Sequence, residues 1–257
     1  FASQINSEFI VTEIKNITKF DEETLRNARY SCLMNVAKKV GCSIIALGHT
    51  KNDVVETFLF NLFRGTGIRG LTGIPFIRET NSNGKKIYLF RPLIDVPKKS
   101  ILESLQQLNI KYVTDSTNLK NFYSRNYVRN IIVPKIKKLF PNFDSNILNT
   151  SLILNEINDY LKFNIDSAFN NAVVVYNKKA HLDFKKFLMY NRLIQKEILI
   201  EIIDTLFKKN KKKFNSSYTK IISSILHFFN TKNVILEINK NMNIKKDDKK
   251  IIFNLKS

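Results

Sequence analysis

The sequence predicts an α/β protein in which a parallel sheet with covering helices is followed by a mainly helical second domain with a short C-terminal hairpin. Two observations support this fold class. Short strand-like runs alternate with helix-like segments in the first half of the chain, and from Ser124 onward the pattern becomes long and helical. Pro141 is the candidate boundary, so the expected domains are residues 1–140 and 141–257.

The first predicted elements are a strand over Ser7–Ile14 and a helix over Asp21–Lys39. The strand follows from alternating apolar and polar residues, and the helix from acidic residues in its first turn and basic residues in its last. Gly41 ends this helix. The next run, Cys42–Leu47, is continuously apolar, which predicts a strand buried on both faces of a parallel sheet.

A helix beginning at Asp53 follows, and a glycine-rich stretch comes after it. The apolar face of this helix consists of Val54, Phe58, Leu59 and Leu62. The stretch "RGTGIRGL" (Arg64–Leu71) contains G-x-G-x-x-G, but a dinucleotide fingerprint leaves a strand and opens a helix, whereas these glycines leave a helix. We therefore predict a helix C-cap and a flexible loop, in which Arg64 and Arg69 lie beside backbone N–H groups that suit phosphate or RNA.

The remaining elements continue this pattern. We expect a strand over Lys85–Leu93, a helix over Pro97–Leu108 and a short strand and loop over Ile110–Asn118. Four long helices are predicted next, over Ser124–Leu139, Asn146–Asn170, Phe184–Lys208 and Ser216–Phe229. The final runs "NVILEIN" and "KKIIFNL" predict a hairpin.

The composition bounds the function. A net charge of +20 and a pI near 9.8 favour a polyanionic partner, nucleic acid first, although a genome rich in A and T would also write many Lys, Asn and Ile codons. No apolar run reaches the roughly 20 residues that cross a bilayer. Cys32 and Cys42 are too few for a zinc cluster and are expected to be reduced, buried thiols. No Ser-His-Asp pattern, Walker loop or zinc spacing occurs, which excludes most hydrolases and kinases.

Polar residues at the carboxyl ends of the predicted strands are the first site candidates, namely His49, Asp53 and Arg91. Asp53 and Glu56 are three residues apart in a first helical turn, so both carboxylates face one direction and could hold an ammonium group or a metal. The alternative is that acidic residues simply favour helix N-termini. His49 could bond a phosphate or a base, or it could be structural.

A second candidate group lies on the helix that begins at Ser124. Arg125 and Arg129 are at i and i+4, so they share one face and could clamp a phosphate. A solvated basic helix would look the same, and the lysine runs near residues 208–213 and 245–250 are also readily explained as solvated surface.

Six segments in order resemble the tRNA(Ile)-lysidine synthetase family over roughly residues 20 to 143. They are "RNARY" (Arg26–Tyr30), "GHTKNDVVET" (Gly48–Thr57), "RGTGIRGL" (Arg64–Leu71), "RPL" (Arg91–Leu93), "DSTN" (Asp115–Asn118) and "YSRNYVR" (Tyr123–Arg129). The wording "GHT..D..ET" is most similar to the cyanobacterial and plastid branch.

This resemblance implies a PP-loop ATP pyrophosphatase fold and a defined reaction. ATP, with Mg²⁺, would adenylate the wobble cytidine of a tRNA(Ile) with a CAU anticodon, and free L-lysine would then displace AMP. The resemblance implies a protein of the plastid stroma, or alternatively of a bacterial cytoplasm, without a membrane. It leaves the oligomeric state open, a homodimer being one option.

The resemblance also assigns residues. Those matched to catalysis are Asp53, Glu56 and Arg125. Those matched to binding of substrate, nucleotide or RNA are Arg29, His49, Arg64, Gly65, Gly67, Arg91, Asn126 and Arg129. No residue is expected to ligate a metal directly.

The sequence departs from the family at three places. Thr50 replaces the second of two histidines, and Asn52 replaces the first of two aspartates. The ATP-binding loop S-G-G-x-D-S does not occur in this sequence. We expect that the sequence begins inside the domain, the alternative being that ATP binding has been lost.

Two other functions remain open at this point. Another PP-loop tRNA-modifying enzyme, such as a sulfur-transfer enzyme, would normally need reactive or cluster-binding cysteines. A basic RNA-binding remnant without catalysis would need only the charge.

Overall fold

The computed structural model describes residues 2–14, 21–82, 84–113, 124–210, 217–232, 234–247 and 250–256. Contacts divide the chain into two compact units, Phe1–Asn155 and Glu156–Ser257. The domain boundary predicted at Pro141 stays a prediction. None of the helices in the described ranges has an uncharged apolar stretch of the length that a bilayer requires.

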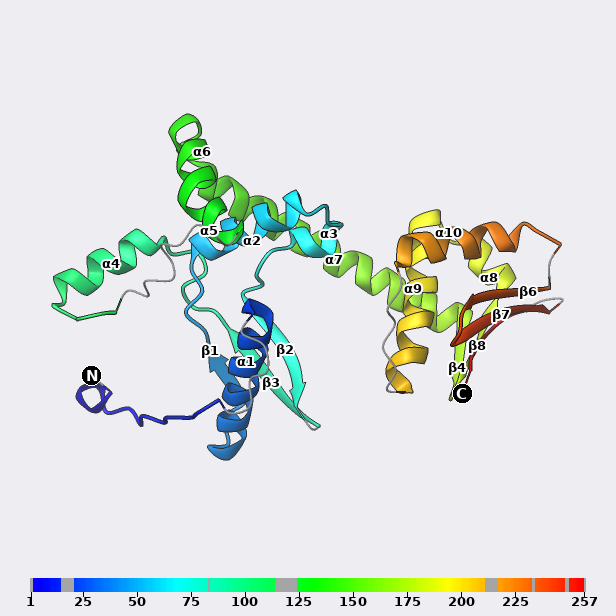
Figure 1. The fold of residues 1–257 in the computed structure, drawn as a ribbon, viewed down its shortest axis with the longest axis horizontal. Coiled ribbons are helices and arrows are strands. Elements are labelled where there is room, and N and C mark those ends of the chain that lie inside the picture. The colour runs from blue at the N-terminus through cyan, green and yellow to red at the C-terminus, as the bar shows by residue number, and fades with distance from the viewer. Residues whose placement is uncertain are drawn as a thin grey trace. The chain divides into compact units, whose positions relative to one another are not determined.

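The first unit contains a mixed three-stranded sheet, in the order β1-β3-β2 (Figure 1). Its strands are β1 (Ile44–Ala46), β2 (Ile77–Ser82) and β3 (Lys85–Phe90). β1 runs parallel to β3, whereas β2 is antiparallel to it, so the prediction of a parallel sheet is right only for one strand pair. No strand was predicted at β2, which forms a hairpin with β3 because Gly84 adopts a φ of 84° in the turn between them.

Helix α1 (Glu22–Lys39) confirms the helix predicted over Asp21–Lys39. Asp21 caps it by accepting a hydrogen bond from the Thr24 backbone N–H at 2.8 Å, and Gly41, at a φ of 73°, turns the chain away. The helix packs on one face of the sheet, where Ala37, Ile45, Ile87 and Leu89 are buried.

Strand β1 corrects the expectation of a strand buried on both faces. Ile45 points into the core, but Ile44 is 60% exposed, because β1 is an edge strand and, among the described residues, α1 covers the face that carries Ile45. Cys42 is exposed and Cys32 is partly exposed, so the prediction of buried thiols is wrong for Cys42, which lies in the turn after Gly41.

The strand predicted over Ser7–Ile14 is not formed. This segment is exposed, with Phe9 at 78%, and no described strand pairs with it. Alternation of apolar residues does not make a strand unless a neighbouring strand supplies the backbone hydrogen bonds. A short 3-10 turn, η1 (Ser3–Ile5), lies before it in the part of the chain that the structure describes.

Helix α2 (Lys51–Phe63) begins at Lys51 rather than at Asp53, because Thr50 is its N-cap. Val54, Phe58 and Leu59 of its predicted apolar face are buried, whereas Leu62 is exposed. The chain then turns at Gly65 and forms the short helix α3 (Ile68–Leu71) inside the segment predicted as a flexible loop.

Helix α4 (Lys98–Gln107) confirms the helix predicted over Pro97–Leu108. The short strand predicted over Ile110–Asn118 is not formed at residues 110–113, and the remainder lies outside the described residues.

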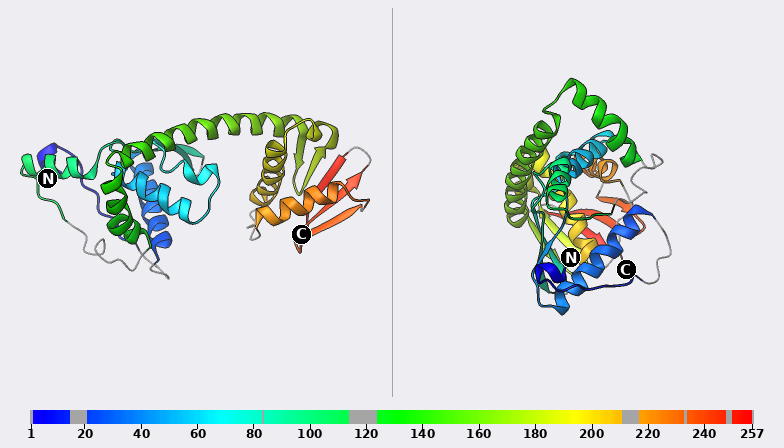
Figure 2. Two further views of the ribbon diagram at one scale, coloured as in Figure 1. Left: turned by 90° about the horizontal axis from the view of Figure 1, so that it is seen from above. Right: turned by 90° about the vertical axis from the view of Figure 1, so that its left-hand side faces the viewer.

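A long helical run begins at Ser124, as predicted. It consists of α5 (Ser124–Tyr127), a π-helical segment, η3 (Val128–Ile132), and α6 (Val133–Leu139). The π segment precedes Pro134, which has no N–H to donate to the carbonyl four residues earlier. Helix α7 (Phe143–Ala172) follows as one continuous helix (Figure 2).

Helices make up much of the second unit, as predicted, but its strands form a larger sheet than the single hairpin that we expected. A five-stranded antiparallel sheet, in the order β4-β5-β8-β7-β6, packs against helices. The strands are β4 (Val173–Tyr176), β5 (Lys179–Asp183), β6 (Ile235–Asn239), β7 (Met242–Asp247) and β8 (Lys250–Leu255). The expected pairing of the two final runs is also wrong, because β8 pairs with β7 and β5, and β6 pairs with β7.

Three helices complete the second unit: α8 (Phe184–Leu188), α9 (Arg192–Lys209) and α10 (Tyr218–Phe229). The single helix predicted over Phe184–Lys208 is interrupted where Asn191 caps α9 by accepting a hydrogen bond from the Ile194 N–H at 3.0 Å. One face of the sheet, including Phe253 and Ile244, packs with α9 and α10 around a buried apolar core.

We predict that the buried side chains of α9 stabilise the second unit more than the exposed side chains of the same helix do. Leu199→Ala should lower the free energy of unfolding by roughly 2–5 kcal/mol, because Leu199 is fully buried and truncation leaves a cavity. Leu193→Ala on the same helix is the control, since Leu193 is 48% exposed. Urea unfolding followed by circular dichroism measures both, and equal losses would contradict the packing described.

Candidate functional site

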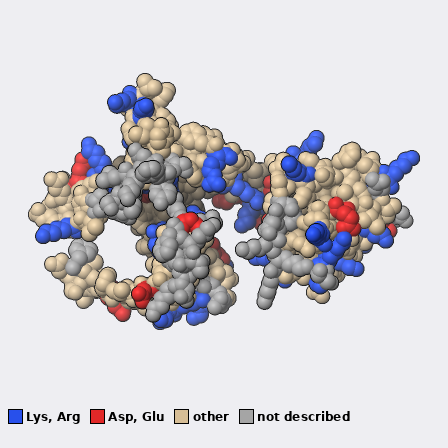
Figure 3. Space-filling model, viewed as in Figure 1, with Lys and Arg blue, Asp and Glu red and all other residues tan. Residues whose placement is uncertain are grey.

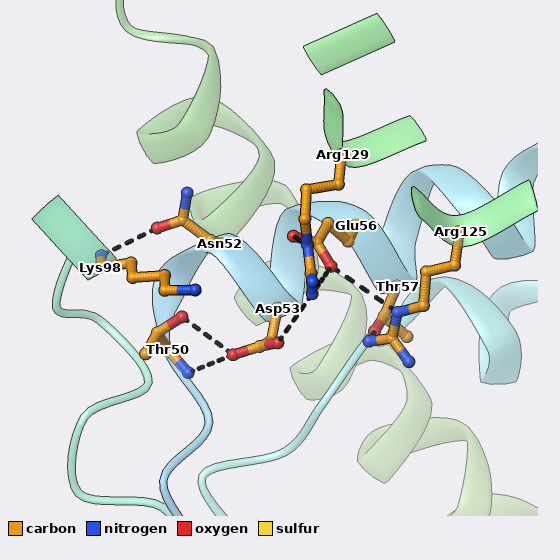
Figure 4. Close-up of polar contacts among 8 residues, drawn as sticks. All are labelled: Thr50, Asn52, Asp53, Glu56, Thr57, Lys98, Arg125 and Arg129. Atoms are coloured by element: carbon orange, nitrogen blue, oxygen red, sulfur yellow. Dashed lines mark hydrogen bonds and ion pairs between the residues drawn. The ribbon is translucent and has the colours of Figure 1, made fainter. Parts of the chain in front are cut away.

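The centre of the site is a buried ion pair between α2 and η3 (Figure 4). Arg129 donates from Nε to Glu56 Oε1 at 2.6 Å and from Nη2 to Oε2 at 2.7 Å, a bidentate arrangement. Arg125 Nε lies 3.6 Å from Glu56 Oε2, and its Nη2 donates to Thr57 Oγ1 at 3.1 Å. The Glu56 side chain is 5% exposed, so both arginines meet its charge away from bulk water.

Asp53, one turn earlier on α2, has a different environment. Its Oδ2 accepts hydrogen bonds from the Thr50 N–H at 2.8 Å and from Thr50 Oγ1 at 2.9 Å, which caps the helix. Its Oδ1 lies 3.8 Å from Arg129 Nη2, beyond hydrogen-bond length, and the side chain is 25% exposed. Asp53 therefore both starts α2 and offers a carboxylate oxygen at a partly open position.

The spacing of these residues predicted part of this arrangement. Asp53 and Glu56, three apart on α2, both approach Arg129, and Arg125 and Arg129, four apart, both approach Glu56. The helix-capping alternative for Asp53 also holds. Asn52, which replaces an aspartate of the family, accepts a hydrogen bond from the Lys98 backbone N–H at 2.9 Å and so connects α2 to the start of α4.

His49 lies half-buried just before α2, among charged groups from four elements of the first unit. Burial lowers the pKa of His49, Asp53 raises it, and Arg91, Arg29 and Arg125 lower it further. The side chain is therefore neutral near pH 7. Its Nδ1 is buried and has no hydrogen-bond partner among the described residues, which leaves a ring nitrogen without a structural role.

Arg91, at the end of β3, is 3% exposed. Its Nη1 donates to the Pro75 carbonyl at 2.7 Å, and its backbone N–H donates to the Phe76 carbonyl at 3.0 Å. Burial lowers the pKa of Arg91, and a hydrogen bond with Tyr30 opposes this shift. The structure thus gives Arg91 a clear role in holding the segment that leads into β2.

The remaining predicted binding residues are more exposed. Arg29 lies exposed on α1, and the Arg64 guanidinium lies over the Phe60 ring at 5.2 Å from its centroid. Gly65 has a φ of 70° as the residue after the α2 C-cap, and Gly67 caps α3. Asn126 is half-buried on α5. The "DSTN" segment and Tyr123 lie outside the described residues.

The glycine-rich segment is fastened at its end by polar residues that the sequence analysis missed. Ser151 Oγ and Asn155 Nδ2, both on α7, donate to the Thr72 carbonyl at 2.7 and 2.8 Å. Asn61 Nδ2 donates to the Gly70 carbonyl at 2.7 Å. A Cβ on Gly73 would come within 2.9 Å of Ser151 Oγ, so the backbone approaches α7 closely there. Serine and asparagine one turn apart on a predicted helix are the sequence signal that could have pointed to this contact.

The described residues do not fit a directly bound metal ion. No group of three His, Cys, Asp or Glu side chains within these residues could ligate one. Both oxygens of Glu56 are engaged by Arg129, and one oxygen of Asp53 is engaged by Thr50. The cationic side chains Arg29, Arg125 and Arg129 fit phosphate groups instead.

A family model described as a PP-loop domain matches residues 1–136. The tRNA(Ile)-lysidine synthase of Borreliella burgdorferi (strain ZS7) is 36% identical over 179 residues, which are 68% of this chain and 38% of that protein. The chloroplastic tRNA(Ile)-lysidine synthase of Gracilaria tenuistipitata var. liui is 30% identical over 224 residues, 85% of this chain and 65% of that protein.

The chain therefore spans less than two thirds of the length of these relatives. Among solved structures, a U34-tRNA thiolase from Methanococcus maripaludis with its [4Fe-4S] cluster matches with a TM-score of 0.48 and 17% identity, over 60% of this chain and 53% of that one.

We predict that His49 titrates below the ordinary value of 6.5. Asp53→Asn should lower its pKa further, because a carboxylate that favours the imidazolium is removed, and Arg29→Gln should raise it. The pKa of His49 is thus lower in the folded state than in the unfolded state. As the pH drops below about 6.5, the unfolded state takes up the proton first, so the free energy of unfolding should fall. NMR titration of the imidazole Hε1, assigned with His49→Gln, measures the pKa, and a rise in Asp53→Asn would refute this electrostatic account.

We also predict that Asn155 stabilises the fold through the Thr72 carbonyl. Asn155→Ala should cost about 1–3 kcal/mol, because it removes one of the two partly buried hydrogen bonds to that carbonyl. Asn164→Ala is a matched control, since Asn164 also lies on α7 and bonds the carbonyl four residues earlier, but is exposed. Denaturant unfolding separates them, and equal effects would count against the contact.

Proposed function

Because the chain belongs to the PP-loop domain family, we propose that it carries the chemistry of a tRNA(Ile)-lysidine synthase. The observation that carries this proposal is the position of Asp53, a 25% exposed side chain whose Oδ1 lies outside the helix cap and 3.8 Å from Arg129 Nη2, in a chain whose relatives bear that name. A carboxylate suits the ammonium group of lysine, and the arginines suit the phosphates of ATP and RNA.

The proposed reaction has two steps. The C2 carbonyl oxygen of the wobble cytidine attacks the α-phosphorus of ATP, and pyrophosphate leaves. An amine of free L-lysine then attacks C2, the C2–O bond breaks, AMP leaves and the amine loses a proton. The substrates are ATP, L-lysine and a tRNA(Ile) with a CAU anticodon.

We assign different roles to the two acidic residues. Asp53 binds and orients the lysine through Oδ1, because this oxygen is not used in the helix cap. Glu56 holds Arg129 and Arg125 in place, because its own oxygens are already engaged. The arginines then face phosphate groups from fixed positions, which lowers the cost of organising the site during the reaction.

His49 and the glycine-rich segment complete the proposal. A neutral imidazole close to Arg29 can accept or donate a hydrogen bond to the substrate without adding charge. Arg64, Gly65 and Gly67 give the segment between α2 and α3 a backbone that can adapt to a nucleotide. Because the described residues do not fit Mg²⁺, no step is assigned to it.

The relative from Gracilaria supports a plastid location for this chain, with a bacterial cytoplasm as the alternative. The chain has a net charge of +20, and Lys and Arg side chains are visible on both units in the face that Figure 3 shows, which agrees with an RNA substrate.

The test is mass spectrometry of the anticodon nucleoside after the protein is incubated with CAU-anticodon tRNA(Ile), ATP, Mg²⁺ and isotopically labelled lysine. We expect label on the wobble cytidine. AMP release without label would instead indicate another nucleophile, and bound but unmodified tRNA would indicate an RNA-binding remnant.

Variants separate the proposed roles. Asp53→Asn should lower product formation at least about a hundredfold while tRNA affinity stays within about threefold, because its carboxylate acts on lysine and not on phosphate. Arg125→Ala should weaken both product formation and tRNA affinity. Glu103→Gln, a change on the exposed surface of α4, is the control. Unchanged tRNA binding in Arg125→Ala would contradict the phosphate role.

A further inference from the structure

The second unit contains a basic cavity that the proposed reaction does not use. It has a volume of about 910 Å³ and lies between the turn of the β4–β5 hairpin and the C-terminal end of α9. Its described lining consists of Val175, Tyr176, Asn177, Lys178, Lys179, Lys209 and Asn210. Lysines therefore enter it from two different elements, and none of these lining residues is acidic.

The turn that carries these residues is held in place. Asn177 adopts a φ of 20° in this turn. Asn210 Nδ2 donates to the Asn177 carbonyl at 3.1 Å and to the Leu206 carbonyl at 2.8 Å. The Lys178 carbonyl accepts a hydrogen bond from the Leu255 N–H at 2.8 Å. The hairpin turn is thus bonded both to the end of α9 and to β8, which fixes the backbone beneath the lysines.

An aromatic ring stands beside these charges. Tyr176 is 57% exposed, and its ring meets His181 at a centroid distance of 5.3 Å with an angle of 66° between the planes. This edge-to-face contact orients the Tyr176 ring without covering both of its faces. Tyr176 pairs with Lys179 across the two strands, so the ring and an ammonium-bearing side chain start from adjacent positions.

The combination identifies the chemistry of the ligand. Lysines attract phosphate, and an exposed aromatic ring stacks on a base whose face is accessible, as in single-stranded nucleic acid. A base inside a duplex offers no such face. Lys209 also benefits from the negative end of the α9 dipole, but this does not explain why lysines of the hairpin line the same cavity.

We propose that this cavity binds an unpaired nucleotide of the tRNA substrate, with the base stacked on Tyr176 and the neighbouring phosphates contacted by Lys179 and Lys209. The proposal rests on the proposed function for the identity of the RNA. It adds a binding site in the second unit, separate from the residues assigned to the reaction.

The test measures the dissociation constant of CAU-anticodon tRNA(Ile) by fluorescence anisotropy at several KCl concentrations, without ATP or lysine. The double variant Lys179→Gln/Lys209→Gln should bind roughly tenfold more weakly, and the salt dependence should decrease by about 1.4 in log–log slope, since each lost phosphate contact with a single strand removes about 0.7. Lys196→Gln, an exposed lysine of α9 outside the cavity, is the matched control.

Tyrosine variants test the stacking separately. Tyr176→Ala should weaken binding roughly tenfold with the salt slope unchanged, and Tyr176→Phe should bind as the original protein does, because the ring remains. Tyr160→Ala, at another exposed tyrosine, is the control. The proposal is overturned if the cavity variants bind like the controls, or if Tyr176→Ala binds as tightly as Tyr176→Phe.

Failure of the inference and failure of the proposed function can be distinguished. Lysidine formation together with cavity variants that bind tRNA normally would overturn the inference alone. Loss of RNA binding in the cavity variants of a protein that makes no lysidine would support the site and overturn the proposed reaction.

Discussion

The buried carboxylate of Glu56 is the constraint on which the arrangement of the first unit depends. A carboxylate removed from water costs several kcal/mol unless a cation and further hydrogen bonds replace its hydration. Here Arg129 provides both hydrogen bonds of a bidentate pair, and Arg125 adds a second positive charge. Because Glu56 comes from α2 and the arginines come from residues about seventy positions later, the pair fixes one helical element against the other.

This constraint separates the two acidic residues of α2 in their chemistry. Both oxygens of Glu56 already accept hydrogen bonds from Arg129, so this carboxylate has little capacity to accept hydrogen bonds from a ligand. Asp53 caps its own helix with one oxygen, and its other oxygen is outside the cap on a side chain that is 25% exposed. Neighbouring carboxylates on one helix thus become a structural anchor and a partly open acceptor. The difference arises from burial and partners and not from residue type.

Local signals in the sequence predicted the local parts of this fold. The charged ends of the helix over Asp21–Lys39, Gly41 as its terminator, the glycine-rich stretch as the end of the next helix, and the i, i+3 spacing of Asp53 and Glu56 are all properties of neighbouring residues, and the structure confirms α1, α2 and α4. These signals also led to the correct rejection of a dinucleotide fingerprint, since the glycines follow a helix.

The parts that the sequence did not predict depend on distant partners. β2 and β7 carry many polar residues and become strands because a neighbour completes their hydrogen bonds, while Ser7–Ile14 alternates well but pairs with no described strand. The pairing of Glu56 with Arg129 and of Ser151 with the Thr72 carbonyl likewise depends on tertiary structure.

Helix α7 supplies Ser151 and Asn155 to the first unit and Ile165, Ala168 and Ala172 to the core of the second, although the family model ends at residue 136. A chain cut just after the matched residues would therefore keep the motifs that resemble the family but lose the two α7 donors that hold the end of the glycine-rich segment.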